Sequence, residues 1–209
     1  MYDRLARIGG AALVVGSAAL VVITLVLQVG NGEQDHTNPM NIAAQWASMP
    51  ISLLVVFGLP ALTARLARRA PVLALLGSAG VALGLLVYGF AIALIDAAVL
   101  PWLLAHHVHV GQPASMLVAL LGGGLGVIVG SVLLGVAVLR SSGFPRAAGA
   151  LLIAAGILYA ASIAPITGWV GTIGVVALLA GLGICGVQLV RTGDVNVSTS
   201  VPAQMQPEA

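Results

Sequence analysis

Six long runs of apolar residues, separated by short polar segments, dominate the pattern along the chain. Each run has about the length of a membrane span, which needs about 20 mostly apolar residues. The runs are apolar on every face, whereas barrel strands alternate apolar and polar positions. In hydrocarbon such a run must satisfy its own backbone and is therefore helical. The sequence predicts an all-α polytopic membrane protein, a bundle of six transmembrane helices over residues 8–27, 42–64, 72–95, 115–139, 147–163 and 169–190.

Composition supports the same class of protein. The chain is 60% apolar and 7% charged, with a mean hydropathy of +1.12, whereas a soluble domain carries roughly 25% charged residues. A soluble protein with a water-facing surface is therefore excluded, and the lipid bilayer is the expected partner of the chain. The basic residues are scattered and form no basic stripe, so no nucleic-acid partner is expected.

The arginines indicate how the chain is threaded. There is no lysine, and all eight arginines flank the predicted spans on one side. The positive-inside rule makes that side cytoplasmic, and an even number of spans then places both termini there. Trp46, Trp102 and Trp169 fall at the opposite boundary, where indole rings prefer to lie. Residues 1–191 are predicted to form the transmembrane domain, and the polar residues 192–209 a disordered cytoplasmic tail.

Prolines inside the second span raise two alternatives. Pro50 and Pro60 each remove one backbone hydrogen bond and tend to kink a helix. They are hinge candidates beside a pocket, or they mark a static kink of the kind that membrane helices tolerate.

Glycines at intervals of four mark the fourth span. Gly122, Gly126 and Gly130 would line one helix face without side chains, so a neighbouring backbone can approach closely. The face packs either within this chain or against another membrane protein or a second copy. A faint internal repeat accompanies it. Arg7-Ile-Gly-Gly-Ala-Ala-Leu-Val resembles Arg146-Ala-Ala-Gly-Ala-Leu-Leu-Ile, and Gly135-Val-Ala-Val-Leu-Arg140 resembles Gly186-Val-Gln-Leu-Val-Arg191.

Candidate chemistry gathers on the side opposite the arginines. His36, His106, His107 and His109 are all the histidines of the chain, and Asp96 is predicted near them. Imidazole ligands suit zinc, copper or haem, and His106 and His109 would share a face if that stretch is helical. The alternative is that these histidines are solvated loop residues. Cys185 is the single cysteine, so an internal disulfide and a CxxC pair are excluded.

The position of Asp96 leaves two interpretations. Counted from Val72 it lies about 36 Å along a helix, beyond a roughly 30 Å core. It is then an interfacial charge, unless a strong tilt keeps it inside the membrane as a functional carboxylate. Residues 97–109, interrupted by Pro101, form either a kinked extension or a short helix on the outer surface.

Other polar side chains lie within the predicted spans. We expect them to hydrogen-bond across helices, with the lining of a path as the alternative. They are Gln45, Ser78, Tyr88, Ser131, Tyr159 and Gln188.

Three features of the sequence carry a resemblance to known proteins. They are the absence of lysine, the content of Ala, Val, Leu and Gly, and arginine-marked spans such as Arg146-Ala-Ala-Gly-Ala-Leu-Leu-Ile. The chain resembles small multi-pass membrane proteins of uncharacterised function from GC-rich actinobacteria, which implies the bacterial plasma (inner) membrane. The resemblance carries no catalytic residues across. We expect an accessory subunit or a small transport or sensing component without evident catalytic machinery. The alternative is a membrane enzyme or a metal- or haem-binding protein that uses the outer histidines.

Overall fold

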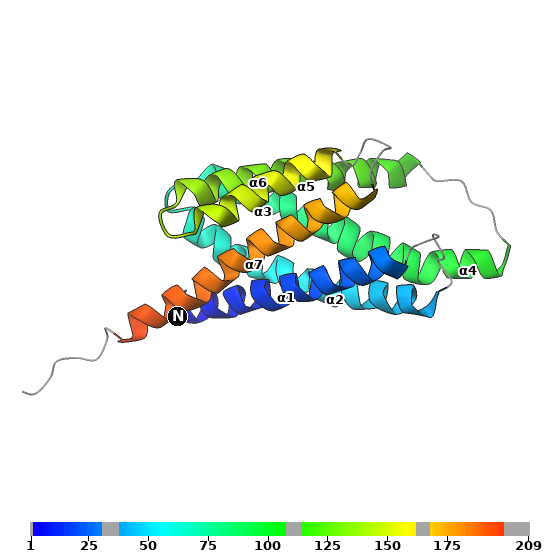
Figure 1. Cartoon of the computed structure of the whole chain (residues 1–209), viewed down its shortest axis with the longest axis horizontal. Coiled ribbons are helices and arrows are strands. Elements are labelled where there is room, and N and C mark those ends of the chain that lie inside the picture. Colours follow the sequence, from blue (N-terminus) through cyan, green and yellow to red (C-terminus); the bar gives the residue numbers. More distant parts are fainter. Residues whose placement is uncertain (1, 31–37, 108–113, 162–167, 199–209) are drawn as a thin grey trace, which may run out of the picture.

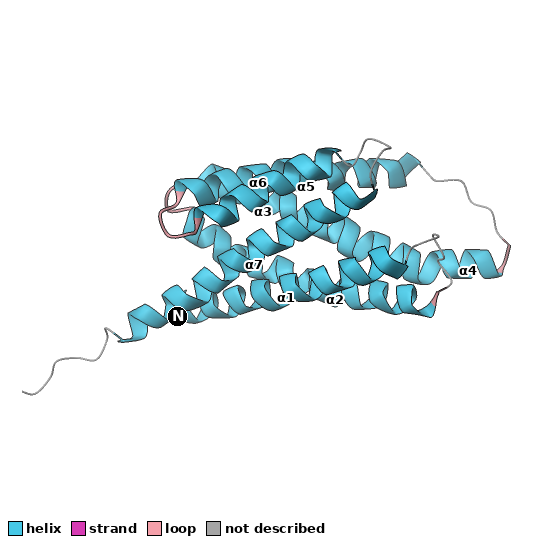
Figure 2. Ribbon diagram, in the orientation of Figure 1, coloured by secondary structure: helices cyan, strands magenta, loops and turns pink. Residues whose placement is uncertain are grey.

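The computed structural model describes residues 2–30, 38–107, 114–161 and 168–198, and every regular element among them is a helix (Figure 1, Figure 2). This confirms the all-α prediction for the described part of the chain. Two π-helical segments, η1 and η2, interrupt one of the runs. The elements are α1 (Tyr2–Gly30), α2 (Pro39–Leu66), α3 (Pro71–Leu86), η1 (Val87–Ile92), η2 (Ile95–Val99), α4 (Leu100–Ala105), α5 (Ala114–Arg140), α6 (Arg146–Ala161) and α7 (Gly168–Ser198).

Helices of membrane-spanning length account for most of these residues. Within the described ranges, α1, α2, α5, α7 and the continuous run Pro71–Ala105 are long and apolar enough to cross a membrane. The sixth helix, α6, has 16 residues and is about 24 Å long, shorter than a roughly 30 Å hydrocarbon core. Helix α7 reaches Ser198, beyond the expected start of the tail, and residues 199–209 lie outside the described residues.

Ile95, the expected end of the third membrane span, is not the end of the helix. The helix continues through η1, η2 and α4 to Ala105, a run of 35 residues, or about 52 Å. The kinked extension is therefore the correct alternative as far as Ala105. Figure 1 shows α4 projecting past the rest of the bundle.

Local sequence explains where several of these helices begin. The Asn38 side chain accepts a hydrogen bond of 2.9 Å from the Met40 backbone N–H, which satisfies one free donor at the start of α2. Pro39, Pro71 and Pro101 occupy the first turns of α2, α3 and α4. A proline fits there because its missing N–H has no partner to lose.

The helices close into a ring in chain order. Helix α1 packs against α2 and α7, α3 packs against α2 and α5, and α6 packs against α5 and α7. Figure 1 shows the N-terminus, the exit of α7 and the turns after α2 and α5 at one end of the bundle. All eight arginines flank these points. We therefore name this the arginine end, and the opposite one the far end.

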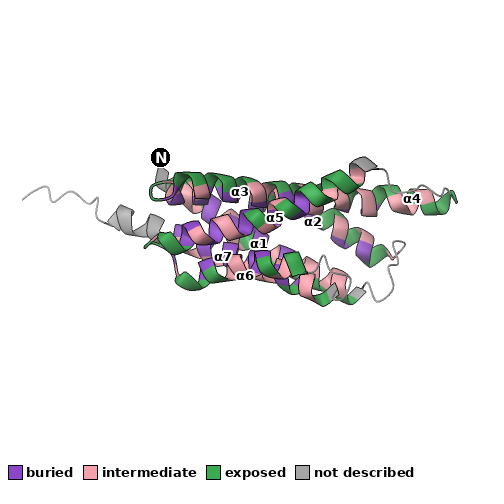
Figure 3. Ribbon diagram, turned by 90° about the horizontal axis from the view of Figure 1, so that it is seen from above, coloured by how far each residue is buried: buried purple, intermediate pink, exposed green. Residues whose placement is uncertain are grey.

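Burial follows the pattern expected of a bundle in lipid. Leu134 and Leu182 are fully buried inside the ring. Large apolar side chains such as Phe57, Val118 and Ile157 are exposed on its outside, and Figure 3 shows exposed positions along the outer faces of the helices. Soluble monomers rarely expose apolar patches of that extent, so the outer surface is compatible with a membrane protein.

Pairs of facing glycines join several of the helix contacts, and two of these pairs belong to the internal repeat. A methyl group added at Gly10 of α1 would lie 2.8 Å from the Gly186 carbonyl oxygen of α7, and one added at Gly186 would lie 2.7 Å from that of Gly10. Gly135 of α5 and Gly149 of α6 face each other in the same way, at 2.8 and 2.9 Å. The internal repeat matches Gly10 with Gly149 and Gly186 with Gly135. The repeated sequence therefore builds the same backbone contact twice.

Candidate functional site

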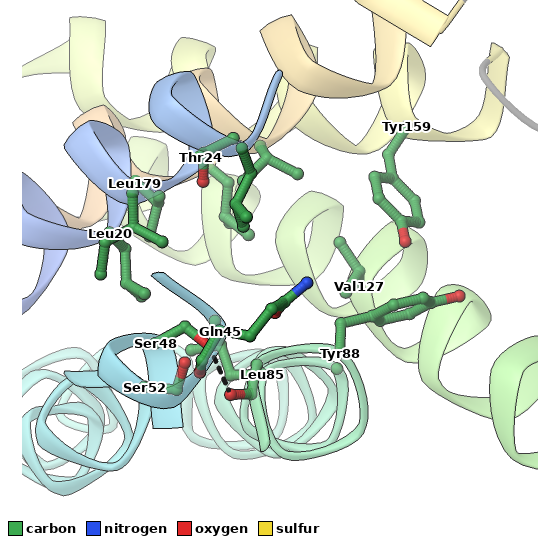
Figure 4. A pocket seen from close by; sticks show the side chains of 16 residues that line it. Leu20, Thr24, Gln45, Ser48, Ser52, Leu85, Tyr88, Val127, Tyr159 and Leu179 are labelled. Carbon is green, nitrogen blue, oxygen red and sulfur yellow. Dashed lines mark hydrogen bonds between the residues drawn. The ribbon is translucent and has the colours of Figure 1, made fainter. Parts of the chain in front are cut away.

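A cavity of about 200 Å³ lies inside the ring, toward the far end, and all six helical runs contribute to its wall (Figure 4). The aliphatic side chains of the lining come mainly from α1, α5 and α7. Polar side chains from four helical runs interrupt this lining; they are Thr24, Gln45, Ser48, Ser52, Tyr88 and Tyr159.

Helix α2 supplies the densest set of polar groups. Gln45, Ser48 and Ser52 follow one another at helical spacing and so share a face. The Ser48 hydroxyl is hydrogen-bonded to the carbonyl oxygens of Gln45, at 2.7 Å, and Gly89, at 3.3 Å. The Gln45 amide nitrogen donates a long hydrogen bond of 3.4 Å to a carboxylate oxygen of Asp96. This side of the cavity is therefore tied to η1 and η2.

Ser52 differs from its neighbours because its hydroxyl is unsatisfied. The residue is 0% exposed, and the oxygen has no hydrogen-bond partner among the described residues. Gly89 lies directly against it, and any side chain at position 89 would collide with the Ser52 hydroxyl. A buried hydroxyl without a partner costs about 1–3 kcal/mol, so its presence in the cavity wall calls for an explanation.

The π-helical segment η1 shapes the wall beside α2. It places Tyr88 and Gly89 at the cavity, and its wider turn breaks the regular spacing of the long run. Insertions of this kind in α-helices occur frequently at functional sites. Of the two π-helical segments in the described helices, η1 contributes residues to the cavity lining and η2 does not.

Two tyrosines close one side. The Tyr88 hydroxyl donates a hydrogen bond of 2.8 Å to the Leu120 carbonyl oxygen of α5. The Tyr88 and Tyr159 rings meet edge to face, with centroids 5.9 Å apart and an interplanar angle of 74°. Gly124 leaves room for both, because a methyl group there would lie 3.1 Å from the Tyr88 hydroxyl. The aromatic wall is thus held in place by α5 and α6.

The charge of the cavity limits what it can hold. No acidic or basic side chain belongs to the lining that the structure describes. Asp96 is one hydrogen bond away, behind Gln45. A bound ion would therefore lack a lining countercharge, and burial of an uncompensated charge is costly. The site suits an uncharged molecule.

Hydrogen bonds between side chains also join helices near the far end. The Thr172 hydroxyl of α7 donates to the Gln28 side-chain oxygen of α1 at 2.7 Å. Together with the Gln45–Asp96 and Tyr88–Leu120 contacts, this bond links helices near the far end.

The predicted metal ligands do not gather among the described residues. No group of three His, Cys, Asp or Glu residues there is placed to hold a metal ion. His36 and His109 lie outside the described residues. Helix α4 ends at Ala105 and His107 has a positive φ of 53°. The helix therefore does not include His106 and His107, and the pairing of His106 with His109 lies outside the described residues and stays a prediction.

His106 has a local role. Its ring stacks on Trp102, with centroids 4.5 Å apart. Its Nδ1 is 2.8 Å from the Trp102 carbonyl oxygen. Both contacts lie within the last turn of α4 and the residue that follows it.

The predicted glycine face divides between two environments. Gly126 and Gly130 pack within the chain, against Gly80 of α3. A methyl group on Gly126 would lie 2.9 Å from the Gly80 carbonyl oxygen, and one on Gly130 would lie 2.6 Å from the Val81 nitrogen. Gly122 faces open space, with nothing within 4 Å of an added methyl group.

The two prolines of α2 lie away from the cavity. The helix continues through Pro50 and Pro60 without interruption, and both are exposed on the outside of the ring. A pocket does lie beside this helix, on the face that carries Gln45, Ser48 and Ser52.

Sequence reasoning missed part of this site. Gln45, Tyr88 and Tyr159 were expected to act mainly as links between helices, and they line the cavity. Ser78 and Ser131 instead bond to carbonyls of their own helices. Thr24, Ser48 and Ser52 were not singled out. The available signal was the Gln45, Ser48, Ser52 spacing, which places three polar groups on one face of an apolar helix.

No protein-family model, curated protein or solved structure matches the chain.

Proposed function

We propose that this chain is a multi-pass protein of the bacterial plasma membrane that binds a small uncharged solute between its helices, as a small transport or sensing component. The observation that carries the proposal is the cavity shared by all six helical runs, with the unsatisfied Ser52 hydroxyl in its wall. Binding sites between helices are typically apolar with a few polar groups that fix orientation. The cavity has that composition.

The proposed topology places the arginine end in the cytoplasm. The one-sided distribution of all eight arginines supports it through the positive-inside rule. Both termini would then be cytoplasmic, and the cavity would lie in the outer half of the membrane.

Small-molecule extraction tests the binding function. The full chain would be purified in detergent and denatured, and the released molecules would be identified by mass spectrometry. Val175→Phe places a ring in the cavity, because Val175 lines it. Ile173→Phe is the matched control, since Ile173 on the same helix is 54% exposed on the outside.

We expect a small uncharged molecule to be released from the wild type and from Ile173→Phe, and not from Val175→Phe. The same set of molecules from all three proteins would reject the cavity as a binding site. Circular dichroism spectra of the three proteins establish that each is folded.

A further inference from the structure

The size, charge and polar groups of the cavity narrow its ligand to one chemical class. The inference rests on the proposed binding function and concerns only which molecule the site takes. A cavity of about 200 Å³ is smaller than the roughly 300–1,000 Å³ of sites for drug-sized ligands. An aliphatic and aromatic cavity of about 150 Å³ holds benzene. The available space therefore matches a single ring with one or two substituents.

The walls specify the surface of such a ring. Leu20, Leu178 and Leu179 present apolar groups from α1 and α7. Tyr88 and Tyr159 contribute an aromatic wall, and aromatic pairs are stabilised beyond the burial of their area. A flat unsaturated ring fits these walls better than a branched chain of equal volume.

The polar groups require an oxygen on that ring. The Ser52 hydroxyl is 0% exposed and has no partner among the described residues. A ligand oxygen in the cavity would satisfy it once the hydroxyl rotates from Gly89 toward the cavity. Ser48 is already engaged with the Gln45 and Gly89 carbonyls, and Tyr88 with the Leu120 carbonyl. Ser52 is therefore the lining group whose hydrogen-bonding capacity is most clearly unused.

The uncharged lining of the cavity excludes acidic and basic molecules of similar size and shape. The described lining residues carry no ionisable acid or base other than the two tyrosines. We infer that the cavity binds an uncharged single-ring molecule of the phenol class, which carries one hydroxyl oxygen that is hydrogen-bonded to Ser52. Molecules of this class dissolve in the bilayer as well as in water, so a site within the membrane is accessible to them.

Three fluorinated probes of nearly equal size separate the features of the ligand. They are 4-fluorophenol, fluorobenzene, which lacks the oxygen, and 4-fluorobenzoate, which is charged at neutral pH. Binding to the detergent-purified full chain would be measured by fluorine NMR. The Val175→Phe protein in the same detergent measures partition of each probe into the micelle.

Two serine variants test the hydrogen bond. Ser52→Ala removes the lining hydroxyl. Ser17→Ala is its matched control, because Ser17 is 2% exposed and its hydroxyl also lacks a partner among the described residues, but Ser17 does not line the cavity. Both changes remove one buried unsatisfied oxygen, so a general effect on packing would appear in both.

We expect 4-fluorophenol to bind the wild type about fivefold more tightly than fluorobenzene, the factor that corresponds to one net hydrogen bond. Binding of 4-fluorobenzoate should not exceed that of the Val175→Phe baseline. Ser52→Ala should weaken 4-fluorophenol binding about fivefold, and Ser17→Ala should leave it unchanged.

Equal binding of 4-fluorophenol and fluorobenzene, preferred binding of 4-fluorobenzoate, or no binding above the micelle baseline would each overturn the ligand class. So would equal affinities of the Ser52→Ala and wild-type proteins. The extraction experiment tests the binding function separately. If a molecule other than a phenol were released from the wild type and not from Val175→Phe, the cavity would remain a binding site and the phenol class would be rejected.

Discussion

The contact between α3 and α5 gives a sharp test of the packing, through Gly130→Ala. The added methyl group would lie 2.6 Å from the Val81 nitrogen, 2.8 Å from the Gly80 carbonyl carbon and 2.9 Å from the Gly77 carbonyl oxygen. All three are backbone atoms, which cannot rotate away. Ordinary contact begins at 3.4 Å, so α3 would have to move by about 0.8 Å.

Overpacking of this kind costs about 1–3 kcal/mol. For a protein of this length, 1 kcal/mol shifts the melting midpoint by roughly 2–4 °C. We therefore expect Gly130→Ala to melt about 5 °C below the wild type. The assay uses the single cysteine, Cys185, which is buried and reacts with a fluorogenic maleimide only when the bundle opens.

The matched control is Gly122→Ala on the same helix. Nothing lies within 4 Å of its added methyl group, and alanine has a helix propensity up to about 1 kcal/mol better than that of glycine. Its midpoint should equal or slightly exceed that of the wild type. Indistinguishable midpoints for Gly130→Ala and Gly122→Ala would refute the close approach of the two backbones.

Three further outcomes are expected. Ser52→Ala should raise the stability of the ligand-free protein by about 1 kcal/mol, because it removes an unsatisfied buried hydroxyl; a lower melting midpoint would contradict this. Gly89→Ala should lower the midpoint by colliding with Ser52, and adding Ser52→Gly should restore much of the loss, as a double-mutant cycle would show. In a Cys185→Ala background, an impermeant maleimide applied to intact cells should label Gly32→Cys and not Ser142→Cys; the reverse pattern would invert the proposed topology.

Apolar runs allowed most helices to be predicted, because the runs are long enough to span a membrane and must then be helical. The end of the third helix was the exception. Ile95 was expected to end the membrane span, with a kinked extension or a short surface helix as the alternatives for residues 97–109. The chain instead accommodates Asp96 by a hydrogen bond from Gln45, and Pro101 falls where a new helical turn begins. The Gln45–Asp96 contact could not be predicted without the neighbouring helix, whereas Pro101 is visible in the sequence.

The glycine stripe shows a second limit of sequence spacing. Residues four apart rotate by about 40° around a helix axis, so Gly122 and Gly130 differ by about 80°. The stripe therefore leaves the α3 contact at one end, which explains the open space beside Gly122. The cavity was less predictable still, since its polar lining comes from helices that are distant in sequence.

The facing glycines give the bundle an uneven stiffness. Gly10–Gly186 and Gly135–Gly149 hold the helices backbone to backbone toward the arginine end, whereas the cavity and the Gln28–Thr172 bond lie toward the far end. A tilt of one helix against its neighbour would therefore pivot at such a glycine contact. Thr24 lies about 14 residues beyond Gly10, or about 21 Å along the helix, so a tilt of about 5° at Gly10 would move Thr24 by about 2 Å. Small rotations at the arginine end would thereby change the width of the cavity toward the far end.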